Sequence, residues 1–392
     1  MAPPAEAHGG RPRAHPRLAR TSVVAVAAGA GTVLPGFLVG VLALQIRDDL
    51  DVSVGTVAAG VTVFFAAGAL GAGPGGRLAE RVGALRAMRG CLVATAVLLG
   101  LASLASSLVL LLAPLALAGL ANSVCQPAIN LFMADQVPRE RQGIAFGVKQ
   151  TAIPAAVLAS GLALPLLALP LGWRPTFALF ALAALAVAMG VGRSAAGFAP
   201  ARLREPPPRP SRALVMTAVG AALGSAGPCA LGAYLVASAV EVGIAEGMAG
   251  LLAAAGSAAS LAVRIGFGIR ADRRRDYGYG MVVALLCGGS LGFVLLAAGA
   301  VAPFVLGALI AFALGWGWPG LFNLAVVELN RGAPGAATGV TQTGIYVGAA
   351  GGPAGFGLLQ SGAGYAAAWA ASGVLVLLAA GAFAYAGRLS HR

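Results

Sequence analysis

Charge is scarce in this sequence. Only 10% of its 392 residues are charged, and only 13 of them are acidic, whereas 59% are hydrophobic. A soluble domain carries about 25% charged residues. A larger soluble core cannot absorb the surplus of apolar residues, because the buried fraction grows only slowly with chain length. The composition therefore argues against a soluble protein and favours a chain that lies in the bilayer.

Residues that commonly carry chemistry are also few. The three histidines lie near the ends of the chain, at His8, His15 and His391. The four cysteines lie in apolar runs without metal-ligand spacing, at Cys91, Cys125, Cys229 and Cys287. No nucleophile–base pair, metal-ligand cluster or carboxylate pair is visible within the apolar runs. The sequence thus predicts a protein that is not an enzyme and holds no metal or cofactor.

The net charge of +13 would suggest a nucleic-acid partner if the chain were soluble. The basic residues, however, form short clusters between apolar runs, which is the positive-inside pattern of membrane proteins. If those runs alternate across a bilayer, 22 of the 26 basic residues fall on one side, and only Arg47 and Arg174 fall on the other. We therefore expect no nucleic-acid partner and both termini in the cytoplasm.

Twelve apolar runs are long enough to cross a bilayer, which requires about 20 residues. The expected spans are 21–46, 53–73, 88–106, 108–133, 143–168, 174–192, 213–239, 245–267, 279–300, 303–328, 336–360 and 365–387. The polar N-terminal stretch is not typical of a signal peptide. We expect a cytoplasmic tail at 1–20, a six-helix bundle at 21–192, a cytoplasmic linker at 193–212 and a second six-helix bundle at 213–388.

The two halves repeat at a constant distance. Four landmarks of the first half recur 192 residues later: Gly76 at Gly268, Pro127 at Pro319, Gln150 at Gln342, and Gly172 at Gly364. An even number of spans in each repeat makes the halves parallel. Transporters with parallel repeats rock the halves around a substrate site near the midplane.

The segment GGRLAERVGALRAM (75–88) resembles the signature between helices 2 and 3 of the major facilitator superfamily. A second copy, GIRADRRRDYG (268–278), lies where that family repeats the signature. The resemblance implies the major facilitator fold, with all-α architecture and twelve transmembrane helices in two parallel six-helix repeats. It also implies a gate on the cytoplasmic side, formed by Gly76, Glu80, Arg81, Gly268, Asp272 and Arg273. Glu80 departs from the aspartate that is usual there.

Two cations lie inside expected spans, Lys149 in the fifth and Arg264 in the eighth. An ionisable group within a span indicates a functional site. No carboxylate is equally deep, because Asp135 and Glu328 lie nearer the span ends. An anionic substrate would therefore satisfy both cations, since arginine suits a carboxylate and lysine offers a point charge. The alternative is structural, with Lys149 snorkelling and Arg264 paired with Asp135 or Glu328.

Arg264 stands four residues before Gly268. In this position it resembles the substrate-binding arginine of the monocarboxylate transporters and the oxalate/formate exchanger. Proton-linked members of that branch have an aspartate four residues before the arginine, where this chain has Ser260. That departure favours anion exchange or facilitated uptake over proton symport.

Neutral polar residues complete the predicted substrate site. Asn122, Gln126 and Asn130 share one face of the fourth span. Gln150 and Gln342 are repeat mates, and Tyr346 follows Gln342 by one helical turn. Each of these residues has the alternative role of joining helices.

The sequence predicts a monomeric multi-pass transporter in a bacterial inner membrane. The favoured substrate is a small organic anion. The first alternative is a proton-coupled drug or metabolite efflux antiporter, although the G-x-x-x-G-P segment of that family is missing from the fifth span, AIPAAVLASGLALP. The second alternative is a sensor on the same fold that does not transport.

Overall fold

The computed structural model describes residues 16–137, 147–192, 210–274, 278–330 and 334–390; of 16–19, 192, 272–274 and 334–336 it describes only the backbone. Within these residues every regular element is a helix. The first half contains α1 (Pro16–Val41), α2 (Ala43–Leu50), α3 (Val54–Val82), α4 (Ala84–Ser103), α5 (Leu108–Gln136), α7 (Ala152–Ala163), the π-helical η2 (Leu164–Ala168), α8 (Leu169–Leu171) and α9 (Trp173–Gly192).

The second half begins after the expected linker, most of which lies outside the described residues. It contains α10 (Arg212–Glu241), α11 (Glu246–Arg274), α12 (Gly280–Leu296), α13 (Val301–Ile310), the π-helical η3 (Ala311–Gly315), α14 (Pro319–Leu329) and α15 (Pro334–Ser390).

The expected spans are confirmed. Ten helices among the described residues are long and apolar enough to cross a membrane. The shorter apolar helix α12 adds one more, and α15 contains two spans that meet at Gly364 (φ 80, ψ 173). The chain is therefore an integral, multi-pass, all-helical membrane protein with the twelve spans expected from its apolar runs.

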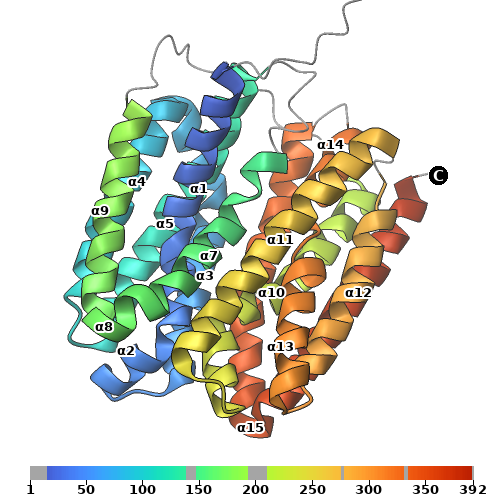
Figure 1. Ribbon diagram of the computed structural model, residues 1–392. Helices are drawn as coiled ribbons and strands as arrows, with labels where there is room; N and C mark the ends of the chain where they lie inside the picture. Colours follow the sequence, from blue (N-terminus) through green and yellow to red (C-terminus); the bar gives the residue numbers. More distant parts are fainter. Residues whose placement is uncertain (1–15, 138–146, 193–209, 275–277, 331–333, 391–392) are drawn as a thin grey trace, which may run out of the picture.

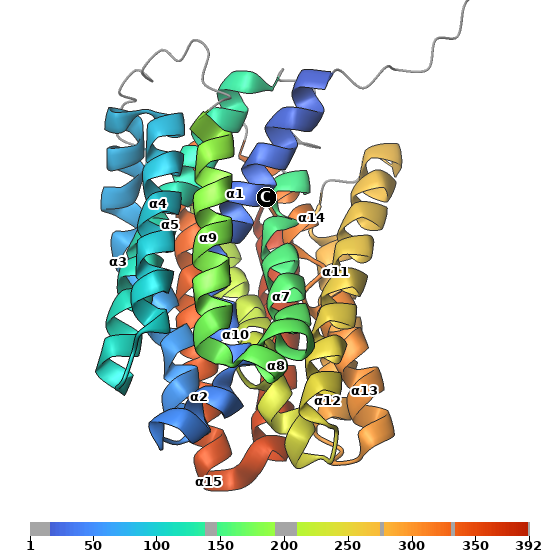
Figure 2. The same cartoon turned by 60° about the vertical axis from the view of Figure 1, so that its left-hand side comes forward.

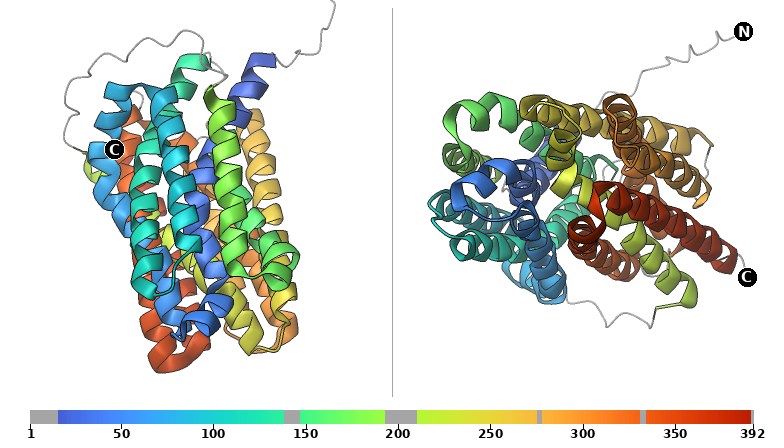
Figure 3. Two further views of the ribbon diagram at one scale, coloured as in Figure 1. Left: turned by 90° about the vertical axis from the view of Figure 1, so that its left-hand side faces the viewer. Right: turned by 90° about the horizontal axis from the view of Figure 1, so that it is seen from below.

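The helices stand side by side with similar directions (Figure 1). In that view α4, α5 and α9 lie on one side, and α11, α12 and α13 lie on the other. The same arrangement is visible after a turn about the vertical axis (Figure 2) and from below (Figure 3). The division into the bundles 21–192 and 213–388 stays a prediction.

The two ends of the molecule differ in charge. The end where α3 turns into α4 carries the exposed arginines Arg77, Arg81, Arg86 and Arg89, and we call it the Arg-rich end. At the opposite end, which holds α2 and α8, Arg47 pairs with Asp48 at 2.6 Å and Arg174 with Asp49 at 2.5 Å. The basic residues of that end thus have acidic partners.

The repeat predicted from sequence extends to local backbone geometry. Gly172 and Gly364 are repeat mates, and both have a positive φ, 91° and 80°. Each ends one span and turns the chain into the next, a conformation that only glycine adopts without strain. The shared turn accounts for the conservation of this landmark between the halves.

Small residues let the helices approach closely. In the second half Gly344, Gly348 and Gly352 of α15 lie against backbone carbonyls of α10, where a Cβ atom would clash. In the first half Gly75 of α3 lies against α5, where an added Cβ would be 2.9 Å from the carbonyl oxygen of Ser123. Close backbone approach through small residues is a main source of helix packing in membranes.

Candidate functional site

Arg264 lies on α11 and is buried, with 5% of its surface exposed. Its guanidinium donates to the carbonyl oxygen of Trp316 from Nε at 3.2 Å and from Nη2 at 2.7 Å. Nη1 donates to the carbonyl oxygen of Gln150. Trp316 belongs to the second half and Gln150 to the first. The arginine therefore links the two halves through backbone carbonyls.

Both acceptors are carbonyls that their own helices leave free. Four residues after Gln150 stands Pro154, which has no N–H to donate to it. Trp316 lies in the turn between η3 and α14, outside any helix. Ser260 adds a third hydrogen bond to the Trp316 carbonyl oxygen, at 3.3 Å. Buried carbonyls of this kind need a donor in a membrane, and Arg264 provides it.

No described carboxylate pairs with Arg264; the two ion pairs among the described residues both lie at the opposite end. The predicted alternative, a pair of Arg264 with Asp135 or Glu328, is not formed among the described residues in this conformation. Of the five N–H groups of a guanidinium, the three hydrogen bonds use three. The positive charge is thus hydrogen-bonded but not neutralised.

Lys149 is the second buried cation, also with 5% of its surface exposed. It precedes Gln150, the residue whose carbonyl accepts from Arg264. Its ammonium group lies near the thiol of Cys125 on α5 and forms no hydrogen bond or ion pair with another described residue. The two cations expected from sequence are therefore both buried, and neither has an acidic partner among the described residues.

A hydrogen-bonded network of neutral side chains also crosses between the halves. The side-chain oxygen of Asn122 on α5 accepts from Thr32 of α1 and from Gln126, each at 3.2 Å. The amide nitrogen of Asn122 donates to the hydroxyl of Tyr346 on α15 at 3.3 Å. Asn122 and Tyr346 are 1% and 4% exposed. The structure thus brings together three of the predicted site residues.

The remaining polar candidates are less connected. Gln342 is half-buried and forms no hydrogen bond with another described side chain. Gln150 takes part through its backbone carbonyl rather than its side chain. Asn130, one turn beyond Gln126, has a buried side-chain oxygen without a partner.

Aromatic rings join the two groups of polar residues. The ring of Trp316 stacks on Phe312, with centroids 5.7 Å apart, and meets the edge of Phe37 at 5.5 Å. Phe37 contacts Phe65 at 5.6 Å, and Phe65 reaches Tyr346 at 6.5 Å. This chain of rings runs from η3 and the turn after it through α1 and α3 to α15. The site therefore consists of a row of aromatic rings, with the buried cations near one end of the row and the amide side chains near the other.

Beyond the site, the halves meet backbone to backbone toward the opposite end. Gly40 of α1 lies against Ala233 of α10, where an added Cβ would be 2.8 Å from Cα. Gly161 of α7 lies against the carbonyl oxygen of Gly250 on α11, at 2.7 Å from such a Cβ. These contacts hold the two halves together near the opposite end in this conformation.

Comparison with known proteins identifies the family. The model of the Major Facilitator Superfamily matches residues 21–353, most of the chain. The chain belongs to the Major Facilitator Superfamily. The membership in this superfamily that the two signature segments predicted is confirmed.

Two kinds of relatives accompany this superfamily match. Plastidic glucose transporter 4 of Arabidopsis thaliana is 29% identical over 170 residues, which span 42% of this chain but only 31% of that protein. The fold resembles a bacterial homolog of the human lysosomal transporter Spinster in an inward-facing, occupied conformation. That structure has a TM-score of 0.73 and 15% identity, and covers 96% of this chain and 98% of its own.

The unoccupied, also inward-facing structure of the same homolog has a TM-score of 0.68 and 13% identity. It covers 96% of this chain and 97% of its own. At these identities the likeness concerns the Major Facilitator fold alone.

Of the two neighbouring glycines of the superfamily signature on α3, only the first permits a close helix approach. An added Cβ at Gly76 or Gly268 would meet no atom within 4 Å, so neither glycine permits a close helix approach here. Gly75 has that role instead. Glu80 is half-buried and Arg81 exposed, and they form no ion pair with another described residue. The side chains of Asp272 and Arg273 lie outside the described residues.

Sequence analysis missed two features of this superfamily site. The first is Phe37, an apolar residue of α1 that contacts Trp316 across the interface; nothing in its sequence context marks it. The second is the free carbonyl of Gln150. The proline four residues later was a usable signal, because it removes the donor for that carbonyl. No group of three or more metal-ligating side chains occurs among the residues searched.

Proposed function

We propose that this chain moves a small organic anion, a carboxylate, across the cytoplasmic membrane by alternating access, as a secondary active or facilitative transporter. In this proposal both termini face the cytoplasm, so that the Arg-rich end lies inside. The observation that carries it is Arg264, a buried guanidinium at the interface of the halves that pairs with no described carboxylate. A carboxylate would supply the missing negative charge and can take two parallel hydrogen bonds from a guanidinium.

Binding would also loosen the interface. In this conformation one N–H of Arg264 donates to the carbonyl of Gln150 in the other half. A carboxylate that takes this N–H removes that link between the halves and replaces a neutral acceptor by a charged one. Lys149, beside Gln150 in the chain, then adds a second positive charge from the first half. Substrate binding and the rocking of the halves are thereby coupled.

The test is ligand binding by purified protein. Thermal unfolding is measured with small carboxylates, inorganic anions, lipophilic cations and glucose, for the wild type and for Arg264→Gln. Arg270→Gln is the matched control, because Arg270 lies on the same helix and is exposed. We expect carboxylates to raise the unfolding temperature of the wild type and the control but not of Arg264→Gln. Stabilisation by lipophilic cations alone would replace the proposal with drug or metabolite efflux.

A second candidate substrate is a neutral polyhydroxyl solute. It is favoured by the amide and hydroxyl network of Asn122, Gln126 and Tyr346 and by the partial similarity to a plant glucose transporter. Amide and hydroxyl side chains suit the hydroxyls of a sugar, but a neutral sugar would provide no counter-charge for Arg264. Stabilisation by glucose that persists in Arg264→Gln and disappears in Asn122→Ala would favour this candidate over the anion.

We further propose that Glu80 and Asp272 act in gating, together with Arg81 and Arg273. Neither Glu80 nor Arg81 pairs with another described residue while Gly40 and Gly161 hold the halves together at the opposite end. This fits a gate whose charges meet only when the Arg-rich end closes. Glu80→Ala or Asp272→Ala should slow transport and leave substrate binding intact. Unchanged transport rates in both variants would remove the gating role.

A further inference from the structure

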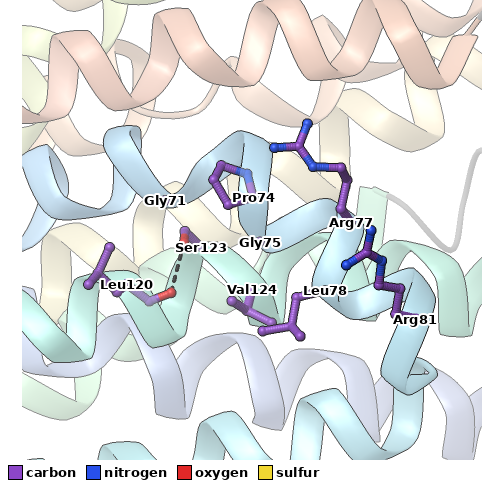
Figure 4. Close-up of a pocket in the computed structure, with 9 residues that line it drawn as sticks. All are labelled: Gly71, Pro74, Gly75, Arg77, Leu78, Arg81, Leu120, Ser123 and Val124. Carbon is purple, nitrogen blue, oxygen red and sulfur yellow. Dashed lines mark hydrogen bonds between the residues drawn. The ribbon is translucent and has the colours of Figure 1, made fainter. Parts of the chain in front are cut away.

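A cavity of about 390 Å³ lies between α3 and α5 near the Arg-rich end, outside the interface of the halves. Figure 4 shows Arg77 and Arg81 at one end of it and Leu120 toward the other. The rest of its lining is Gly71, Pro74, Gly75 and Leu78 from α3, and Ser123 and Val124 from α5.

This cavity faces the surrounding bilayer. Leu120 and Val124 stand two residues from Asn122 along α5, which places them on the other side of the helix. Asn122 faces the interface, where it contacts Tyr346. Leu78 and Leu120 are 49% and 39% exposed. Their exposed surface therefore lies on the lipid-facing side of the first half.

The walls of the cavity are apolar because its one hydroxyl is already bonded. Ser123 Oγ donates to the carbonyl oxygen of Leu120 at 2.7 Å. Gly71 and Gly75 carry no side chain, so the backbone of α3 lies directly against Ser123 of α5 and forms the floor of the cavity. A side chain at Gly71 would run into Ser123 Oγ. The cavity is thus an apolar slot that the packing of α3 on α5 maintains.

The open end of the slot is positively charged. Arg77 and Arg81 are four residues apart, so they project from one face of α3 with a rise of about 6 Å between them. Both are exposed, and neither forms a hydrogen bond or ion pair with another described residue. Glu80, on the same turn, does not pair with them either. An apolar slot in the bilayer with two unpaired arginines at its mouth fits one kind of molecule.

We propose that this slot binds an anionic phospholipid of the leaflet at the Arg-rich end. The lipid phosphate lies between the guanidinium groups of Arg77 and Arg81, and an acyl chain enters between Leu78, Leu120 and Val124. Gly71 lies six residues, about 9 Å, deeper along α3 than Arg77. This distance places the lipid headgroup at Arg77 and the start of the acyl chain beside Gly71. The guanidinium group of arginine can donate two parallel hydrogen bonds to the oxygens of a phosphate.

Native mass spectrometry of the purified protein with phosphatidylglycerol, phosphatidylcholine or inorganic phosphate tests the site. The decisive variant is R77Q/R81Q, which removes both charges. Its matched control is R86Q/R89Q, two exposed arginines of the same end that do not line the slot. Each arginine near an anionic surface contributes about 1 kcal/mol, so we expect phosphatidylglycerol affinity to fall about 10- to 30-fold in R77Q/R81Q and not in the control.

A second pair of variants separates the slot from the charges. Leu120→Trp fills the slot and keeps both arginines, and Leu117→Trp places the same ring on exposed α5 surface outside it. Only Leu120→Trp should lose the bound lipid. The proposal is overturned if both arginine variants bind phosphatidylglycerol equally, if phosphatidylcholine binds as well, or if inorganic phosphate displaces the lipid. None of these readouts depends on the transported substrate.

Discussion

The fourth and tenth spans are repeat mates that contain the same proline and respond to it differently. Pro127 lies within the continuous helix α5, whereas Pro319 starts α14 after a π-helical segment and a turn. Proline removes one N–H in both places. The proline alone therefore does not break the helix, and other residues of the tenth span must do so.

Two differences account for the break. Trp316 is flanked by Gly315 and Gly317, where the fourth span has Ser123 and Cys125. The second difference lies on the neighbouring helix. Arg264 donates to the carbonyl of Trp316, and its repeat mate is Ala72, which cannot donate. A membrane helix can open only where another group satisfies its backbone. The same arginine that stabilises the break is the proposed anion ligand.

The largest effect is expected for Gly317→Ala. An added Cβ would clash with the carbonyl oxygen of Ala313 and lie 2.7 Å from Cγ1 of Val263. Overpacking of this kind costs about 1–3 kcal/mol. Thermal unfolding in detergent measures the loss. Gly320→Ala is the control, because its added Cβ meets no atom within 4 Å. Equal stability of the two variants would show that the turn at Trp316 does not need glycine.

Arg264→Leu should come next. The carbonyl of Gln150 loses its donor, at about 1–3 kcal/mol, and the carbonyl of Trp316 keeps only the hydrogen bond from Ser260; relief from burying the guanidinium offsets part of this cost. We expect a net loss of about 1–2 kcal/mol, and a smaller loss for Arg264→Lys, which keeps a donor. The measurement is again thermal unfolding, without ligand. A variant as stable as the wild type would contradict the role of Arg264 at the helix break.

Pro154→Ala should weaken the link between Arg264 and the first half. It supplies an N–H that can donate to the carbonyl of Gln150, which then no longer depends on Arg264. A double-mutant cycle measures this coupling. The cost of Arg264→Leu should fall by about 0.5–1.5 kcal/mol in the Pro154→Ala background. Additive effects of the two substitutions would argue that Gln150 and Arg264 are not energetically connected.

Tyr346→Phe should have the smallest effect. It removes the hydroxyl that accepts from Asn122 at 3.3 Å, and side-chain hydrogen bonds between membrane helices contribute about 0.6 kcal/mol on average. Unfolding measurements should show a loss of this size. Tyr385→Phe, at a position that is 52% exposed, should leave stability unchanged. A loss of several kcal/mol would mean that the network carries much more of the interface than its geometry implies.

Much of the fold could be predicted, because each span is an apolar run and the landmarks of the first half recur 192 residues later in the second. The burial of Arg264 and Lys149 was also predictable, since both stand within such runs. The hydrogen-bond partners of Arg264 were not predictable in this way, because they are backbone carbonyls, and the type of a residue does not show whether its carbonyl is free. The close approach at Gly75 rather than Gly76 depends on the rotation of α3 against α5, which apolar periodicity does not define to one residue.

The central claim is that a carboxylate bound at Arg264 is carried between the two sides of the membrane. Flux of the carboxylate that stabilises the protein, measured in proteoliposomes, tests this most directly. We predict saturable uptake by the wild type and by Arg270→Gln, and a loss of at least about tenfold in Arg264→Gln, the equivalent of about 1.4 kcal/mol. Equal uptake by Arg264→Gln, or binding by the wild type without any flux, would contradict the account.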